Sequence, residues 1–113
     1  MDRDELVFTI EVRPDGDSAL VAPHGELDMG TQEELRAVLV EQAAAGDVTL
    51  DLAGIRFLDT SGLRLILETA EASRRDGFRF TVLPGAPSVQ RLFEIAGVLE
   101  LVPFRDDGEE AGS

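Results

Sequence analysis

Short segments with the alternating hydrophobicity of β-strands are interleaved along this chain with longer segments that have the spacing of amphipathic helices. Strands are predicted at Leu6 to Arg13, Ser18 to Pro23, Val48 to Leu52, Phe78 to Leu83 and Val98 to Phe104, and helices at about Thr31 to Ala45, Ser61 to Asp76 and Ser88 to Ala96. This order predicts an α/β fold in which about three main helices pack against a mixed β-sheet of about five strands. A short turn joins the first two strands, so we expect an N-terminal β-hairpin.

Capping residues and glycines mark where the predicted elements end. The run from Gly25 to Gly30 is expected to break the second strand. Thr31 and Glu34 have the separation of a capping box, in which each side chain accepts a backbone N–H at the start of a helix. Glycine favours the conformation that ends many helices, and one follows each predicted helix, at Gly46, Gly77 and Gly97.

Length and composition favour one small domain without a cofactor. The chain has 113 residues, which is enough for a single hydrophobic core. We expect the ordered domain to span residues 6–104, between a flexible start (1–5) and an acidic, disordered tail (105–113). The absence of cysteine excludes disulfides and thiolate metal sites. The single histidine, His24, has no second ligand or nucleophile near it in sequence, so we interpret it as a loop residue that faces solvent.

The charge balance restricts the partners that the chain can bind. Its formal net charge is −13, with 23 acidic residues against 10 basic residues, all of which are Arg. Nucleic acids are bound by basic patches, so this composition argues against a nucleic-acid partner and favours a basic protein surface. No segment approaches the roughly 20 apolar residues of a membrane span, and the charged start lacks the apolar core of a signal peptide. We therefore expect a cytoplasmic protein with no membrane partner.

The run Phe57-Leu58-Asp59-Thr60-Ser61-Gly62-Leu63 places three helix-capping residue types where one helix start can use only one. Two of them are therefore spare. A hydroxyl beside a carboxylate at a helix N-terminus is where a phosphoryl group can be attached and recognised, because free amides and the helix dipole favour an anion there. The run indicates a phosphorylation switch at Thr60, and a purely capping role for the hydroxyls is the alternative.

Four segments of the chain carry a family pattern: Gly25 to Asp28, Val48 to Leu52, Phe57 to Leu63 and Val89 to Gly97. Together they resemble bacterial anti-sigma factor antagonists of the STAS-domain family, and the resemblance covers about Leu6 to Phe104. Its most specific part is the Asp-[Ser/Thr]-[Ser/Thr]-Gly-Leu motif, which begins here at Asp59. The earlier Gly-Glu-Leu-Asp run strengthens the resemblance.

The resemblance implies a regulatory protein and no enzyme. Members of the family are substrates of an anti-sigma factor that is also a Ser/Thr protein kinase. The unphosphorylated antagonist binds that anti-sigma factor and so frees a sigma factor. Phosphorylation at the first hydroxyl residue of the motif ends the binding, and a metal-dependent phosphatase reverses it. Carried over to this chain, the resemblance makes Thr60 the phosphoacceptor and Ser61 a secondary candidate, and a weak homodimer is left open.

Residues around the motif are predicted to contact the partner kinase: Glu26, Asp28, Asp59, Thr60, Ser61, Gly62, Arg64 and Leu65. Glu26 and Asp28 could equally form a polar turn, and Leu65 could be half-buried against the first helix. Arg64 departs from the family, which usually carries a small residue there. We hypothesise that Arg64 pairs with phosphorylated Thr60, and a solvated surface Arg is the alternative. Asp51 is interpreted as a structural hydrogen-bond acceptor at a strand end.

Other functions remain as alternatives on the sequence alone. A STAS-type scaffold, or a subunit of a transport complex, would need no phosphorylation and should tolerate Thr60→Asp or Thr60→Glu. The Asp59-Thr60-Ser61 run also resembles the Asp-Thr-Gly loop of aspartic proteases, but those enzymes need two such carboxylates in β-rich halves. A response-regulator receiver is excluded because it requires a Lys and this chain has none.

Overall fold

The computed structural model describes residues 7–105, and these residues form an α/β fold, as predicted. The elements follow one another in the order β1 (Thr9–Asp15), β2 (Ser18–Leu27), α1 (Gln32–Ala45), β3 (Asp47–Asp51), β4 (Ile55–Leu58), α2 (Thr60–Asp76), β5 (Phe80–Leu83), α3 (Pro87–Ala96) and the 3-10 helix η2 (Leu99–Leu101). The start at 1–5 and the tail beyond residue 105 lie outside the described residues. No helix within residues 7–105 combines the length and apolarity that a membrane span requires.

The mixed sheet is built around β2. β1 pairs antiparallel with β2 through a hairpin, which confirms the predicted N-terminal hairpin. β2 then pairs in parallel with two strands in succession, first with β3 from Ser18 to Val21 and then with β4 from Gly25 to Leu27. β5 pairs in parallel with β3 on the far side. Because β2 reaches β4, its C-terminal end lies next to the segment that leads into α2.

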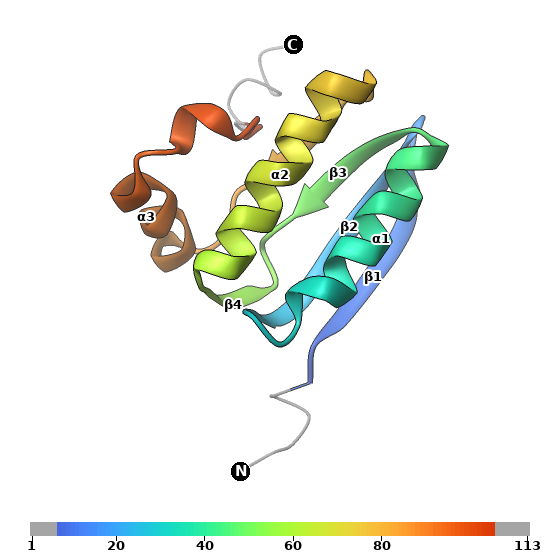
Figure 1. The fold of residues 1–113 in the computed structure, drawn as a ribbon. Coiled ribbons are helices and arrows are strands. Elements are labelled where there is room, and N and C mark those ends of the chain that lie inside the picture. The colour runs from blue at the N-terminus through green and yellow to red at the C-terminus, as the bar shows by residue number, and fades with distance from the viewer. Residues whose placement is uncertain (1–6, 106–113) are drawn as a thin grey trace.

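Helices α1 and α2 lie side by side across one face of the sheet, and α3 lies on the far side of α2 from α1 (Figure 1). The core between these layers is apolar and mostly aliphatic, because alternate residues of the strands meet the apolar stripes of the helices. Its fully buried members include Val21, Leu50 and Val82 from the sheet and Leu35, Leu39, Ile66 and Phe93 from the helices. The glycines that end α2 and α3, Gly77 and Gly97, adopt the left-handed conformation that the sequence predicted.

The predicted break of β2 at Gly25 is wrong. β2 continues to Leu27, and Gly25 adopts a φ of +117° at the point where the strand shifts register and changes its partner from β3 to β4. Glycine tolerates a positive φ that other residues avoid. The glycine therefore marks a bulge inside the strand and not its end. His24 consequently lies in β2, exposed as predicted but not in a loop.

Two further differences concern short elements. No strand was predicted between Ala53 and Leu58. β4 buries Ile55 and Leu58 and exposes the two residues between them, and this pattern lacks the alternation that indicates a strand. The strand predicted from Val98 to Phe104 is wrong. That segment contains η2, and only Phe104 bridges to β5, through Val82, while its ring packs edge-on against Phe93.

Candidate functional site

The start of α2 is capped by Asp59, which leaves the two hydroxyl residues of the motif without a capping role. The Asp59 carboxylate accepts a hydrogen bond from the Gly62 N–H at 3.1 Å. The Asp59 N–H donates to the Leu27 carbonyl at 3.2 Å, so the last residue of β2 fixes the capping residue in place. Three capping residue types compete at this helix start, and this backbone contact explains why the first of them is used.

Gly62 holds the first turn of α2 close to the ends of β2 and β4. A Cβ atom at this position would lie 2.5 Å from Leu58 Cδ1, 2.7 Å from Leu27 Cγ and 2.9 Å from the Leu27 carbonyl oxygen. Any larger residue would therefore push the helix start away from the strands. The buried Gly62 lets α2 pack closely on the strands, and its N–H donates to the capping Asp59. It therefore has a structural role and offers no side chain to a partner.

Thr60 occupies the first position of α2 and is exposed, and Ser61 follows it half-buried. Neither hydroxyl forms a hydrogen bond within residues 7–105. The first turn of α2 contains no acidic side chain. Helix starts leave backbone N–H groups without intrahelical partners, and these groups favour an anion. An added phosphoryl group on Thr60 would thus meet amides and a positive dipole end.

The β2–α1 loop lies directly beside this helix start through the Leu27–Asp59 contact. Its predicted capping box is wrong, because the Thr31 side chain makes no cap hydrogen bond. The Thr31 hydroxyl instead donates to the Glu26 carbonyl at 2.7 Å and accepts the Asp28 N–H at 3.0 Å, and Asp28 accepts the Gly30 N–H. Asp28 is therefore half-buried and engaged in shaping the loop, whereas the Glu26 side chain is exposed.

Two exposed apolar side chains on the segments that adjoin the start of α2 were not among the predicted site residues. Met29, in the β2–α1 loop, is 75% exposed, and Phe57, which pairs with Glu26 across β2 and β4, is 50% exposed. Phe57 lies in a strand that the sequence did not reveal, so its face of the sheet could not be predicted.

The structure corrects the prediction for Leu65 and supports that for Asp51. Leu65 is 1% exposed, so it is a core residue and cannot be an exposed contact for a partner. α2 buries a wider face than one stripe because both the sheet and α1 cover it. Asp51 accepts the Ala53 N–H at 3.0 Å, as expected of a structural acceptor at a strand end. Arg64 is exposed and forms no ion pair with any residue from 7 to 105.

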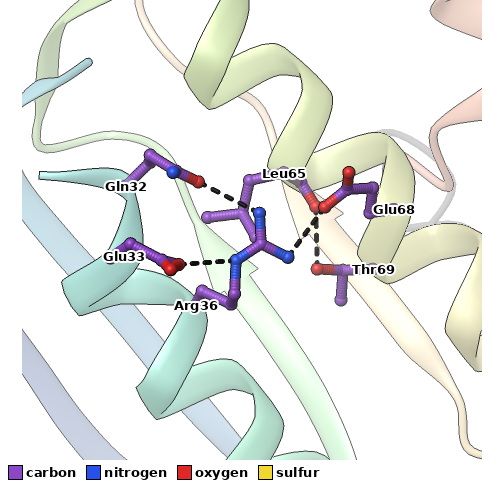
Figure 2. A network of polar contacts seen from close by, with 6 residues as sticks. All are labelled: Gln32, Glu33, Arg36, Leu65, Glu68 and Thr69. Carbon is purple, nitrogen blue, oxygen red and sulfur yellow. Dashed lines mark hydrogen bonds and ion pairs between the residues drawn. The ribbon is translucent and has the colours of Figure 1, made fainter. Parts of the chain in front are cut away.

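A charged network joins α1 to α2 further along α2 than the motif (Figure 2). Arg36 of α1 donates to Glu33 and to Glu68 of α2, each at 2.8 Å, and to Gln32 at 3.1 Å. The hydrogen bond to Glu68 is the main cause that raises the pKa of Arg36 above its ordinary value, and partial desolvation opposes it. Sequence spacing could have suggested the Glu33 contact but not the contact between helices.

No group of three or more His, Asp or Glu side chains in the described part of the chain is placed to hold a metal ion. The His24 Nε2 lies 3.8 Å from the Glu11 carboxylate, and this is its only ion-pair contact among residues 7–105. The residues at the start of α2 are thus hydroxyls, a capping carboxylate and an exposed guanidinium, and the adjoining loop and strand carry two exposed apolar side chains. This set can accept a covalent modification and bind a protein surface.

Comparisons with known proteins relate the chain to one family. The STAS domain model matches residues 9–111. The anti-sigma-B factor antagonist of Staphylococcus epidermidis is 33% identical over 87 residues, which are 75% of this chain and 81% of that protein. The crystal structure of an anti-sigma factor antagonist from Mycobacterium paratuberculosis has a TM-score of 0.78 at 24% identity, over 87% of this chain and 85% of that chain.

SpoIIAA of Bacillus, a further anti-sigma factor antagonist of known structure, shares the fold at 21% identity. Its unphosphorylated form has a TM-score of 0.69 over 93% of each chain. Its phosphorylated form has a TM-score of 0.64 over 94% of this chain and 97% of that chain. Because the family model spans nearly all of the described residues and a relative above 30% identity matches over most of its own length, the chain belongs to the STAS-domain family.

Proposed function

We propose that this chain is a cytoplasmic anti-sigma factor antagonist that works by partner switching and not by catalysis. In its unphosphorylated form it binds an anti-sigma factor that is also a Ser/Thr protein kinase, and so frees a sigma factor. Phosphorylation of Thr60 ends that binding, and a metal-dependent phosphatase restores it. Relatives named as anti-sigma-B factor antagonists, and SpoIIAA with its two phosphorylation states, support this proposal.

The single observation that carries the proposal is that one residue at the start of α2 caps the helix and another is left exposed, without a hydrogen bond from its side chain within residues 7–105. Asp59 caps the helix, so the exposed Thr60 hydroxyl is left without a structural role. Beyond the capping Asp59, which accepts the Gly62 N–H, the first turn lacks acidic side chains, so its remaining free amides are available to a phosphate. The modification therefore has a low cost in the free protein.

The same phosphate would be costly inside a complex. Phosphorylation adds close to two negative charges next to Asp59, on a chain whose net charge is already −13. A dianion that loses water at an interface without a matching cation is strongly unfavourable. A loss of about 4 kcal/mol weakens binding about a thousandfold. The switch thus requires no change of fold.

We propose that exposed apolar side chains on the segments that adjoin the start of α2 supply the attraction that the phosphate opposes. Met29 and Phe57 lie on the loop and strand that adjoin the start of α2, and Glu26 lies beside Phe57. Apolar anchors surrounded by charged groups are typical of protein interfaces. We propose that these residues contact the kinase, together with Asp28, Asp59, Thr60, Ser61 and Arg64.

A phosphorylation assay tests this function. The protein is mixed with candidate kinase-type anti-sigma factors and ATP, and the added phosphoryl group is located by mass spectrometry. We expect one group on Thr60, none after Thr60→Val, and continued phosphorylation after Ser61→Ala. If no candidate kinase binds or modifies the protein, the proposal fails and the scaffold interpretation is favoured.

A further inference from the structure

The ion pair between Arg36 of α1 and Glu68 of α2 is linked to the proposed switch by the spacing of three residues along α2. Thr60, Arg64 and Glu68 follow one another at intervals of four residues, so they lie on the same face of the helix. Side chains at this spacing can pair. Arg64 therefore has two anionic neighbours to choose from on its own helix once Thr60 is phosphorylated: the phosphate one turn before it and Glu68 one turn after it.

Glu68 is occupied by a different cation. Arg36 Nη1 donates to Glu68 Oε1 at 2.8 Å, and the contacts of Arg36 with Glu33 and Gln32 fix its guanidinium toward α2 (Figure 2). The side chains of Arg36 and Glu68 are 38% and 47% exposed, so the pair is partly shielded from water. Arg64, by contrast, is exposed and forms no ion pair within residues 7–105.

We infer that Arg36 is a positioning residue for the switch: by holding Glu68 it leaves Arg64 available to the phosphate on Thr60, and so favours the phosphorylated state. The inference rests on the proposed function, since it presupposes a phosphate at this position. Without Arg36, Glu68 competes with the phosphate for the Arg64 guanidinium. With Arg36 in place, Glu68 is already paired. Arg64, one turn from Thr60 on the same face of α2, is then available to the phosphate.

A phosphorus NMR titration tests this inference. Phosphothreonine is incorporated at position 60 during translation, and the pH midpoint between the phosphate monoanion and dianion, its second ionisation, is measured. Arg64 stabilises the dianion, so Arg64→Gln should raise the midpoint by about 0.3 pH unit. Arg36→Gln should raise it by part of that amount. Adding Glu68→Gln to Arg36→Gln should return the midpoint to the wild-type value, because the competing carboxylate is then gone.

The same titration in an Arg64→Gln background shows whether Arg36 acts through Arg64 or whether its charge acts directly on the phosphate. If Arg36 acts through Arg64, Arg36→Gln should leave the midpoint unchanged in that background. An equal rise in both backgrounds, or no rise in either, overturns the inference. Because the phosphothreonine is installed without a kinase, failure of every kinase to modify Thr60 would count against the proposed function and would not affect this measurement.

Discussion

The starts of α1 and α2 lie next to each other and are built in opposite ways. The first turn of α1 carries two acidic side chains, Glu33 and Glu34, whereas the first turn of α2 carries none. At α1 the Thr31 hydroxyl turns away from the helix to bind the β2–α1 loop. At α2, Asp59 caps the helix and the following Thr60 hydroxyl is unused.

This contrast indicates what each helix start is for. Acidic groups in a first turn already satisfy the positive end of the dipole, so α1 gains little from a further anion. α2 combines a cap made by the Asp59 carboxylate, a first turn without acidic side chains and an exposed hydroxyl. Its arrangement is stable without a phosphate and can also accept one, which is what a reversible switch requires.

The close approach of α2 to the strands provides the largest expected effect. Gly62→Ala places a methyl group within 2.9 Å of the Leu27 carbonyl oxygen, and we expect a loss of about 2 kcal/mol in the free energy of unfolding, measured with urea. The matched control is Gly30→Ala beside the start of α1. Its Cβ would lie no closer than 3.4 Å to Asp28 Oδ1, so the change should stay within about 0.5 kcal/mol. Equal losses in both variants would show that Gly62 has no special packing role.

The cap itself has a smaller expected effect. Asp59→Ala removes the acceptor of the Gly62 N–H, and we expect the free energy of unfolding to fall by about 1 kcal/mol. Asp59→Asn keeps an acceptor at the cap and should retain most of the stability. Urea unfolding of both variants checks this result. If the alanine variant is as stable as the wild type, Thr60 or Ser61 can cap α2 and the hydroxyls are not spare.

The bridge between the helices has the smallest expected effect on stability. A double-mutant cycle with Arg36→Gln and Glu68→Gln should give a coupling of about 0.5 kcal/mol, because both side chains are partly exposed. Glu68 raises the pKa of Arg36 above its ordinary value. The stabilisation linked to protonation of Arg36 is therefore present below the ordinary Arg range and is lost as the pH rises through the folded-state pKa. Unfolding measured at low and high salt checks the coupling, which should weaken with salt. A coupling that is zero at low salt would contradict the observed contact.

The sequence was sufficient for the fold class and the helices because both depend on local periodicity. The stripe of Leu63, Ile66 and Ala70 in α2, for example, is visible in the residue spacing and is buried as expected. Gly25 was misread because a glycine in a strand can mark either an end or a bulge, and only the neighbouring strand decides which. β4 is four residues long and lacks alternation, so it left no local signal.

The candidate site was predictable where its chemistry is contiguous in sequence. Asp59, Thr60 and Ser61 are adjacent, so the surplus of capping groups could be recognised, but the choice of Asp59 as the cap depends on the Leu27 carbonyl, which is distant in sequence. The contact of Arg36 with Glu68 spans 32 residues and could not be predicted from helix spacing. Leu65 was misassigned because a single apolar stripe underestimates the buried face of a helix that both a sheet and another helix cover.

The affinity of the unphosphorylated protein for its kinase-type anti-sigma factor tests the central claim most directly. Thr60→Glu puts a carboxylate at the first position of α2, and the matched control Ser88→Glu puts one at the exposed second position of α3. We predict that Thr60→Glu weakens binding at least about tenfold, which is about 1.4 kcal/mol, while Ser88→Glu changes it by less than about twofold. Equal affinities for Thr60→Glu and the wild type, with both variants folded, would contradict the account.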